Sequence, residues 1–362
     1  MEPEEKIQAR NLVKDYILYE KKRLFQRKTK RTVHAVRNIT LEIPKGKIIG
    51  VLGINGAGKT TTIRMLASLI TPTSGALTMD GVDAVTNHLW VKERINVISG
   101  GERNLYWRLT ARENLRYFGS LYGLSGKELN ERISHLIGIV GLENAQDIPV
   151  ERYSKGMKQR LQIARGLIND PQYIFLDEPT LGLDIMIAKE IRELISKLAK
   201  ERGKGVLLTT HYISEAEELC DYIYVLDKGE VIAQGTKEEL KELFMYQPEL
   251  SVVISSEAPS QSMNGAYLDN NMAILNELRE HFHDQIRIEN GLERVLHISG
   301  TSKDWSDVLN VLFEQQIQIQ NLSIHEPNLE EILMKIISQS REEKYEKESV
   351  SNEGGDKKTT AE

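Results

Sequence analysis

The sequence predicts an α/β fold in which helices cover both faces of a mostly parallel sheet, followed by a smaller α+β domain. Short apolar runs, such as Ile174–Leu176 and Val206–Thr210, alternate with segments whose apolar residues recur at helical spacing. Such alternation is typical of parallel sheets, whose strands are buried on both faces. A glycine-rich loop lies between a predicted strand and a predicted helix within Ile48–Leu69. After about Tyr246 the predicted order becomes β-α-β-β-α-β, which indicates a ferredoxin-like domain.

Length and composition exclude several classes of protein. The 362 residues suffice for about two domains at the usual ~100–200 residues each. The single cysteine, Cys220, cannot form an internal disulfide, so a disulfide-stapled secreted scaffold is excluded and a reducing cytosol fits. A net charge of −6 disfavours a general nucleic-acid-binding surface. No apolar run approaches the ~18–20 residues needed to span a bilayer, so a role at a membrane requires a membrane partner.

Residues from about Ile7 to Ile49 are predicted as short strands. An apolar-polar stretch and a basic interruption come first, and Ile39–Ile43 and Lys47–Leu52 follow. The basic interruption, Lys21–Arg31, contains seven Lys and Arg residues. One interpretation is a solvated hairpin tip. The other is a contact with anionic lipid headgroups, to which each nearby Lys or Arg adds ~1 kcal/mol of attraction.

The remaining elements follow in order along the chain. A helix is expected from Ala111, another over Ile191–Leu198, and a hairpin turn at Asp227–Gly229. The second part is predicted to contain strand Leu250–Ile254, helix Met272–Phe282, hairpin Ile286–Ile298 with an Asn290-Gly291 turn, helix Trp305–Leu312, strand Ile317–Ile324 and helix Leu329–Ile336. The expected domains are residues 1–245 and 246–340. The stretch 341–362 has almost no apolar residue and is expected to be disordered.

The glycine-rich loop has the spacing of a phosphate-binding loop. Residues 53–60 match G-x-x-x-x-G-K-[ST] in full, in the strand–loop–helix context that the motif requires. Glycines let backbone N–H groups approach phosphate oxygens, and the helix N-terminus adds a positive dipole. Lys59 is expected to reach the β- and γ-phosphates and Thr60 to hold Mg²⁺. The residues predicted to bind the phosphates are Gly53, Ile54, Asn55, Gly56, Ala57, Gly58, Lys59, Thr60 and Thr61.

Two carboxylates follow the apolar strand Ile174–Leu176. Asp177, at the strand end, can accept hydrogen bonds from the water shell of Mg²⁺ and is predicted as a metal residue together with Thr60. Glu178 can orient and deprotonate an attacking water. Such an acidic pair by itself is more often a cap at a strand end, but the phosphate-binding loop upstream favours the catalytic interpretation.

With both motifs in place, Ile7–Leu243 resembles the ATP-binding subunits of ABC transporters. The signature loop of that family precedes the acidic strand, and Tyr153-Ser154-Lys155-Gly156-Met157 stands at its position. The resemblance implies that Ser154 and Gly156 bind the γ-phosphate held by the other subunit of a head-to-tail dimer. Lys155 and Met157 differ from the commonest form of the loop. This variant resembles the ABC-2 branch of drug, antibiotic and polysaccharide exporters.

The same resemblance assigns further elements. Leu181-Gly182-Leu183-Asp184 matches the D-loop, which adds Asp184 to the nucleotide-binding set, and His211 matches the switch histidine that contacts the γ-phosphate. Tyr16 resembles the aromatic residue that stacks on adenine, with Tyr19 as the alternative because of the basic insertion. The Q-loop glutamine, which senses Mg²⁺ and the transmembrane partner in the family, has no counterpart here. Gly101 occupies its place, beside Glu102.

The resemblance also implies a fold and a function. The fold is a P-loop ABC ATPase domain, with a RecA-like core, an antiparallel β subdomain and a helical subdomain. The ferredoxin-like α+β domain follows as an accessory unit that regulates the ATPase or supports the dimer. The chain is expected to bind ATP and Mg²⁺, to form a homodimer or pair with a second ATPase subunit, and to power a separate membrane permease. It would lie peripherally on the cytoplasmic face of the membrane and bind no nucleic acid. The patch Leu105, Tyr106, Trp107 and Leu109 either packs in the helical subdomain or docks a cytoplasmic helix of the permease.

Three other functions fit the sequence less well. An importer ATPase of the maltose type carries a β-barrel accessory domain, which the two predicted C-terminal helices disfavour. A soluble ABC ATPase that acts on ribosomes usually has two nucleotide-binding domains, and this chain has one phosphate-binding loop. A DNA-repair ATPase of this fold carries long coiled coils or zinc-binding cysteines, which the sequence lacks. The expected function is therefore an exporter ATPase whose cargo, a drug, antibiotic, peptide, lipid or polysaccharide, is chosen by the permease.

Overall fold

The computed structural model describes residues 5–20, 29–99, 105–242, 249–254, 286–290, 294–300, 302–315, 317–325, 330–334, 336 and 338. Contacts divide the chain into two units. The first comprises Met1–Leu240 together with Leu333–Glu362, and the second comprises Lys241–Ile332. Each unit has its own sheet.

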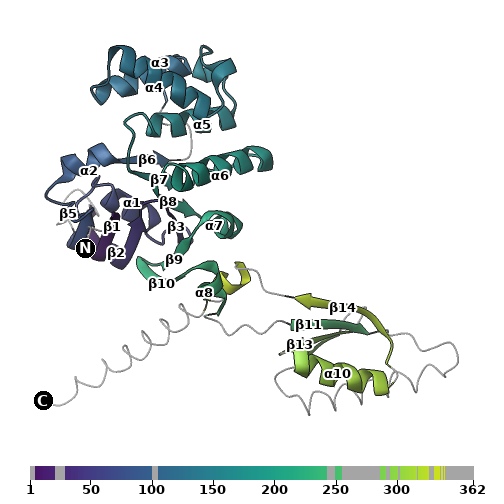
Figure 1. Cartoon of the computed structure of the whole chain (residues 1–362). Helices are drawn as coiled ribbons and strands as arrows, with labels where there is room; N and C mark the ends of the chain where they lie inside the picture. The colour runs from purple at the N-terminus through teal and green to yellow at the C-terminus, as the bar shows by residue number, and fades with distance from the viewer. Residues whose placement is uncertain are drawn as a thin grey trace, which may run out of the picture. The chain divides into compact units, whose positions relative to one another are not determined.

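A ten-stranded sheet forms the centre of the first unit (Figure 1). Its strand order is β5-β4-β1-β2-β10-β9-β3-β8-β7-β6. The edge formed by β5, β4, β1 and β2 is antiparallel, and the run from β9 through β3, β8 and β7 to β6 is parallel. The strands are β1 Lys6–Glu20, β2 Thr29–Pro44, β3 Ile48–Leu52, β4 Ser74–Met79, β5 Val82–Asp83, β6 Ile95–Ser99, β7 Tyr173–Asp177, β8 Gly205–Thr210, β9 Tyr222–Asp227 and β10 Glu230–Gly235.

The central parallel strands are buried on both faces, as their apolar sequences predict. Every residue of β3 and β8 is buried. In β7, Ile174 and Leu176 belong to the core on one face of the sheet, and Tyr173 and Phe175 belong to the core on the other. Successive side chains of a strand point to opposite faces, so this single strand holds both cores together.

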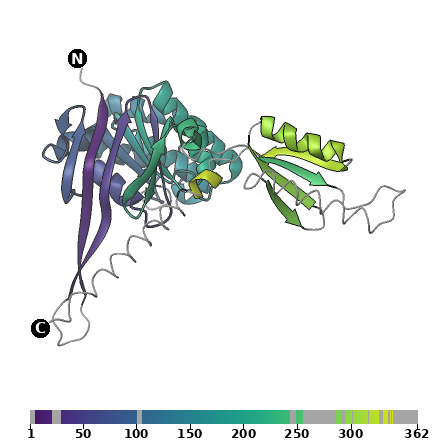
Figure 2. The same ribbon diagram turned by 90° about the horizontal axis from the view of Figure 1, so that it is seen from below.

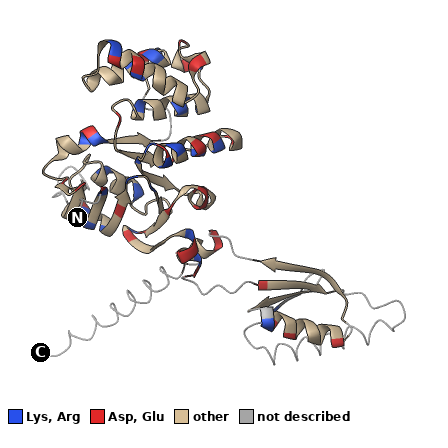
Figure 3. Ribbon diagram, viewed as in Figure 1, with Lys and Arg blue, Asp and Glu red and all other residues tan. Residues whose placement is uncertain are grey.

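Helices cover both faces of this sheet. α1 and α2 share one core with the antiparallel strands, and α5, α6 and α7 share the other core. Figure 1 shows α3, α4 and α5 as a compact helical group, and Figure 3 shows charges of both signs along α6. The helices are α1 Lys59–Leu66, α2 His88–Arg94, α3 Ala111–Leu121, α4 Gly126–Ile139, α5 Lys155–Gly166, α6 Ile185–Lys200, α7 Ile213–Leu219 and α8 Lys237–Glu242, with 3₁₀ turns at Glu143–Ala145 and Val150–Arg152.

Two local predictions are confirmed by their backbone chemistry. The helix expected from Ala111 begins there, because Thr110 and Glu113 form a reciprocal capping box. The hairpin turn between β9 and β10 has Lys228 at φ +48° and Gly229 at φ +82°, the two left-handed positions of a type I′ turn.

The prediction of short strands at the N-terminus is wrong. β1 and β2 have 15 and 16 residues and pair from Lys6 opposite Pro44 to Glu20 opposite Thr29. Figure 2 shows these two strands running on beyond the others of the sheet. Register shifts interrupt the pairing near Asn11, which has φ +50°. Such bulges break the alternation of apolar residues, which made one long strand resemble separate short ones.

The second unit contains a four-stranded antiparallel sheet in the order β12-β13-β11-β14. Val308 and Leu312 of α10 pack with Leu250, Val252 and Leu296 of the sheet in one core. The strand order and the helix after β13 agree with the predicted ferredoxin-like arrangement. The elements are β11 Glu249–Ile254, β12 Ile286–Asn290, β13 Arg294–Ser299, α10 Ser302–Glu314 and β14 Ile319–His325.

Several predicted segments lie outside the described residues: Lys21–Lys28, Met272–Phe282, Gly291 and residues 341–362. Residues 330–334 are helical, and Ile332, Leu333 and Ile336 are buried there. Within the described ranges, no helix combines the length and the apolar character that crossing a membrane requires.

Candidate nucleotide-binding site

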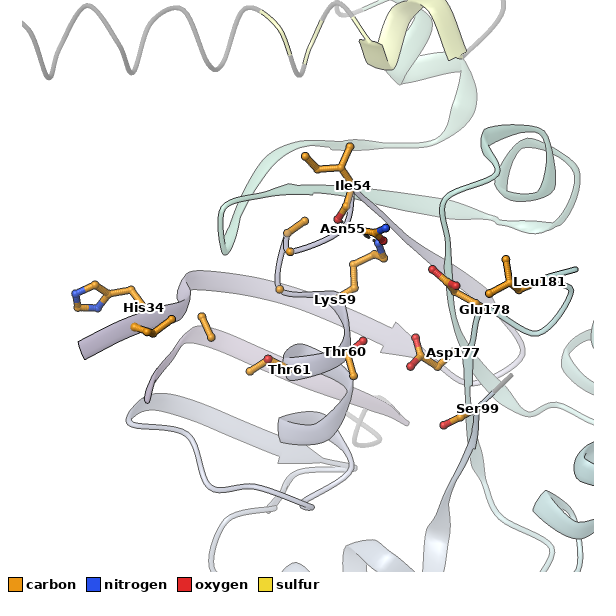
Figure 4. Close-up of a pocket in the computed structure, with 15 residues that line it drawn as sticks. His34, Ile54, Asn55, Lys59, Thr60, Thr61, Ser99, Asp177, Glu178 and Leu181 are labelled. Carbon is orange, nitrogen blue, oxygen red and sulfur yellow. Dashed lines mark hydrogen bonds between the residues drawn. The ribbon is translucent and has the colours of Figure 1, made fainter. Parts of the chain in front are cut away.

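A cleft of about 520 Å³ opens beside the N-terminus of α1, a volume within the usual range for small-molecule sites. Figure 4 shows its lining. Eight of the nine predicted phosphate-binding residues line it, from Ile54 to Thr61, together with Asp177 and Glu178. The ninth, Gly53, does not line the cleft, but its carbonyl oxygen accepts a hydrogen bond from Lys59. The other lining residues are Val33, His34, Ala35, Ser99 and Leu181.

The phosphate-binding loop requires glycine at particular points. Gly56 and Gly58 have φ of +86° and +102°, a region that L side chains rarely adopt. A Cβ on Gly58 would lie 2.8 Å from the carbonyl oxygen of Ala35, and one on Gly53 would lie 2.5 Å from that of Leu226. The loop therefore takes its shape from both its own conformation and its close packing on β2 and β9.

Lys59 is folded back over this loop. Its side chain is buried, and Nζ donates hydrogen bonds to the carbonyl oxygens of Gly53 at 2.6 Å and Ile54 at 3.3 Å. Burial lowers the pKa of Lys59, against the opposing effect of the Glu178 and Asp177 carboxylates. Two neutral carbonyl oxygens accept from this buried ammonium within the described residues. A charged acceptor forms a stronger hydrogen bond than a neutral one, so the ammonium would bind an anion more strongly than it binds these carbonyls.

The two acidic residues at the end of β7 have different surroundings. Asp177 accepts a 2.6 Å hydrogen bond from the hydroxyl of Thr209 on β8. Glu178 has φ +52°, and its N–H donates to the carbonyl of Thr209 at 3.0 Å. Its Oε1 lies 3.2 Å from Nδ1 of His211. The structure thus pairs the two predicted catalytic side chains, with His211 behind Glu178 and outside the lining of the cleft.

Thr60 and Asp177 both line the cleft, and hydroxyl and carboxylate oxygens are the ligands that Mg²⁺ prefers. Across the part of the chain that the structure describes, no group of three or more His, Cys, Asp or Glu side chains could hold a metal ion. Two protein oxygens suit a cation that takes its other ligands from water and phosphate.

Ser154, Gly156 and Asp184 lie on other elements and do not line the cleft. Ser154 caps α5 by accepting from the N–H of Met157 at 3.2 Å, and Asp184 caps α6 by accepting from Ile187 at 2.9 Å. A Cβ on Gly156 would lie 2.6 Å from the side chain of Ile187. The signature loop and the D-loop thus pack against each other, apart from the phosphate-binding loop of the same chain.

The predicted adenine-stacking residue is also absent from the lining. Tyr16 is half-buried opposite Val33, which does line the cleft, and Lys14 Nζ lies 5.5 Å from the centre of its ring. The alternative, Tyr19, is exposed opposite Lys30. The stacking role of Tyr16 stays a prediction. Gly101 and Glu102 lie outside the described residues.

The apolar patch near residue 106 is partly buried and partly exposed, and its role in docking a permease stays a prediction. Leu105 is buried in the core of the helical group, whereas Tyr106 and Trp107 are about half exposed. Lys158 Nζ lies 5.2 Å from the ring centre of Trp107.

A second cleft, of about 620 Å³, lies between α1, α2 and β6 on one side and the helical group on the other. All of its lining residues belong to the first unit, and we call it the interdomain groove because the helical group forms one of its sides. Leu69, Phe118, Leu121 and Tyr122 supply its apolar lining, and Arg64, Lys92 and Arg165 supply positive charge. Thr60, Ser99 and Asp177 line both this groove and the first cleft.

Sequence analysis missed Ser99 and the segment Val33–Ala35. The signal for Ser99 was its position at the end of a buried strand that runs beside the strand of Asp177, to which it is paired. The signal for Val33–Ala35 was the pairing of the hairpin that carries Tyr16.

Comparisons with known proteins agree with this geometry. The family described as "ABC transporter" matches residues 36–181. The chain is 48% identical over 220 residues to the ABC transporter ATP-binding protein NatA of Bacillus subtilis, covering 61% of this chain and 89% of NatA. It is 43% identical over 205 residues to Nod factor export ATP-binding protein I of Cupriavidus metallidurans, covering 57% of this chain and 67% of that protein. Among solved structures, a dimeric post-hydrolysis state of the ATP-binding cassette MJ0796 with ADP and Pi is 28% identical, with a TM-score of 0.55, covering 64% of this chain and 98% of that one.

Proposed function

Because this chain belongs to the ATP-binding proteins of ABC transporters, we propose that it hydrolyses ATP to drive a separate membrane permease that exports its cargo. The observation that carries the proposal is the pairing of Glu178 with His211 beside a phosphate-binding loop whose lysine is buried. Export is supported by the similarity to a Nod factor export protein. The permease would hold the chain at the cytoplasmic face of the membrane.

Each residue of the cleft would have its own role in ATP hydrolysis. The phosphates of ATP would take the place of the two loop carbonyls around Lys59, and the amides from Gly56 to Thr60 would hold the phosphate oxygens. Mg²⁺, held by Thr60 and Asp177, would neutralise charge on the phosphates when bound. Glu178 would accept the proton of the attacking water. His211 would orient that carboxylate through Nδ1, leaving its other ring nitrogen free for the γ-phosphate.

A second subunit would complete the site. Ser154, Gly156 and Asp184 do not line the cleft of their own chain. The N-terminus of α5 is an anion-binding end of a helix. In a head-to-tail dimer it would face the γ-phosphate of the partner, so ATP would hold the two subunits together. The dimeric relative with ADP and Pi supports this arrangement.

The interdomain groove is the proposed docking site for the permease. Leu69 and Leu121 are 56% and 65% exposed there, although apolar side chains of this size gain ~1.5–3 kcal/mol from full burial. The surrounding Arg64, Lys92 and Arg165 favour an amphipathic helix with acidic residues.

The hairpin of β1 and β2 is proposed as a lipid contact. Ile17, Leu18 and Tyr19 are about half or more exposed, and Tyr19 pairs with Lys30 while Leu18 pairs with Arg31. Apolar and basic side chains together suit the interface of an anionic membrane. Binding to phosphatidylserine vesicles should fall at least tenfold in the double variant Lys30→Glu, Arg31→Glu, while binding to phosphatidylcholine vesicles stays weak.

The proposed function is tested by co-purification and hydrolysis together. If a neighbouring reading frame encodes a membrane protein, a tagged chain expressed with that protein should co-purify with it. In Lys59→Ala, transport should be lost together with ATP hydrolysis. Leu121→Glu should weaken the complex without reducing ATP binding, and Ile148→Glu, at an exposed position outside the groove, should leave the complex intact. Co-purification with ribosomes and no membrane protein would favour the soluble alternative.

A further inference from the structure

The nucleotide cleft and the interdomain groove meet at three residues. Thr60, Ser99 and Asp177 line both cavities, whereas every other described lining residue belongs to one of them. Two of the three are the predicted metal residues. Ser99 is the third, and no role has been assigned to it so far.

Strand pairing places Ser99 directly beside Asp177. Ser99 ends β6, and its partner in the parallel ladder is Asp177 at the end of β7, whose partner on β8 is Thr209. Neighbouring strands lie ~4.8 Å apart. Asp177 therefore stands in a row between two hydroxyl residues, at the end of the sheet where α1 presents Thr60.

The hydrogen bonds of this row leave three oxygens uncommitted. Thr209 donates to Oδ1 of Asp177 at 2.6 Å. The second oxygen of Asp177 and the hydroxyls of Ser99 and Thr60 form no hydrogen bond or ion pair with the described part of the chain. Figure 4 shows Thr60 and Asp177 pointing toward each other, with the hydroxyl of Ser99 directed to the side on which Thr60 lies.

Three oxygens of this kind suit a hard divalent cation. Mg²⁺ binds to a few protein oxygens, keeps several waters, and takes further ligands from phosphate. A serine hydroxyl can bond to nearby backbone. The free hydroxyl of Ser99 is instead available to a ligand in the cleft.

We propose that the Ser99 hydroxyl is a third protein oxygen in the coordination shell of the divalent cation that accompanies the nucleotide. This inference rests on the proposed function, since it takes the cation and ATP as ligands of the cleft. Because Ser99 also lines the interdomain groove, a permease helix seated there would touch a ligand of the cation directly. The binding of that helix and of the cation would then be thermodynamically linked.

A cysteine at position 99 tests the contact directly, because a thiolate binds Cd²⁺ far better than Mg²⁺. ATP binding by the full chain is titrated with Mg²⁺ and with Cd²⁺ for the wild type and for Ser99→Ala, Ser99→Thr and Ser99→Cys. We expect Ser99→Ala and Ser99→Cys to need ~10–100 times more Mg²⁺ for half-maximal ATP binding, and Ser99→Thr to stay near the wild type. Only Ser99→Cys should regain tight ATP binding in Cd²⁺, with a new thiolate-to-Cd²⁺ charge-transfer absorption that depends on ATP.

The matched control is Thr60→Cys, at the predicted metal residue. If Thr60→Cys gains the Cd²⁺ preference and absorption but Ser99→Cys behaves like Ser99→Ala, the inference about Ser99 is overturned and the proposed nucleotide site stands. If neither cysteine variant responds to Cd²⁺, the metal site of the proposed function fails as well. If Ser99→Cys does not fold, the contact is tested instead by Mn²⁺ electron paramagnetic resonance, in which Ser99→Ala is compared with the wild type. An unchanged Mn²⁺–ATP spectrum in that variant would overturn the inference.

Discussion

Replacing Glu178 by Gln isolates the chemical step from binding. The amide has the size of the carboxylate and can keep the contact with Nδ1 of His211, now 3.2 Å from Oε1. The backbone bond from Glu178 to Thr209 is also unaffected. What is lost is the base that accepts the proton of water. A positioned general base contributes ~10²–10⁴-fold, so the barrier should rise by about 2.7–5.4 kcal/mol at about 1.36 kcal/mol per tenfold.

The assay measures phosphate release, ATP affinity and the mass of the particle in solution on the same preparation. Glu178→Gln should release phosphate ~10²–10⁴ times more slowly and bind ATP with Mg²⁺ as the wild type does. Light scattering should show a dimer in ATP and a monomer in ADP, because the γ-phosphate joins the subunits. Adding Ser154→Arg should abolish the dimer, and Glu201→Gln, on the exposed end of α6, should change none of these properties. Phosphate release within about twofold of the wild type would refute Glu178 as the base.

Three further variants test the burial of Lys59, the close contact at Gly58 and the hydrogen bond between Thr180 and Glu215. Burial lowers the pKa of Lys59 below its ordinary value. Between the folded-state and unfolded-state pKa values the unfolded chain binds more protons, so the free energy of unfolding should rise with pH there. Denaturant titrations of Lys59→Met should lack this rise, and a rise that persists would belong to another group. Gly58→Ala should weaken ATP binding at least tenfold and lower the free energy of unfolding more than Gly46→Ala does. Both positions have positive φ, but only a Cβ at Gly58 would lie close to another atom. Equal losses of stability in the two variants would show that the close contact is unimportant. The hydroxyl of Thr180 donates to the buried Glu215 at 2.7 Å. Thr180→Val should therefore lower the free energy of unfolding in urea by about 1–3 kcal/mol, whereas Thr180→Ser should keep the stability of the wild type. Equal stability of the two variants would contradict the importance of this bond.

The parts of the site that sequence analysis predicted are those that depend on local geometry. The positive φ angles of Gly56 and Gly58 and the helix that follows are all requirements of one short segment, and a motif states such requirements directly. The position of Asp177 at the end of a buried strand is equally local. The roles of Ser154 and Gly156 came from family resemblance, and the structure of one chain leaves them outside the cleft.

The parts that it missed depend on pairing between distant segments. Ser99 has no motif of its own, and its importance arises from the register that sets it beside Asp177. The long hairpin was predicted as short strands because bulges near Asn11 interrupt its alternation. A pattern of period two identifies a strand but cannot state which partner it takes.

Glu178 shows how the fold sustains an unfavourable residue where chemistry needs it. A left-handed backbone at a non-glycine residue costs ~1–2 kcal/mol, and glycine would adopt φ +52° at less cost. Glycine, however, has no carboxylate. The strain is maintained by contacts with one neighbouring segment, because Thr209 accepts the backbone N–H of Glu178 and His211, two residues later, meets its side chain. Thr209 also donates to Asp177. The end of β8 therefore sets both the predicted base and the predicted metal residue, so a displacement of this one strand end would alter hydrolysis and metal binding together.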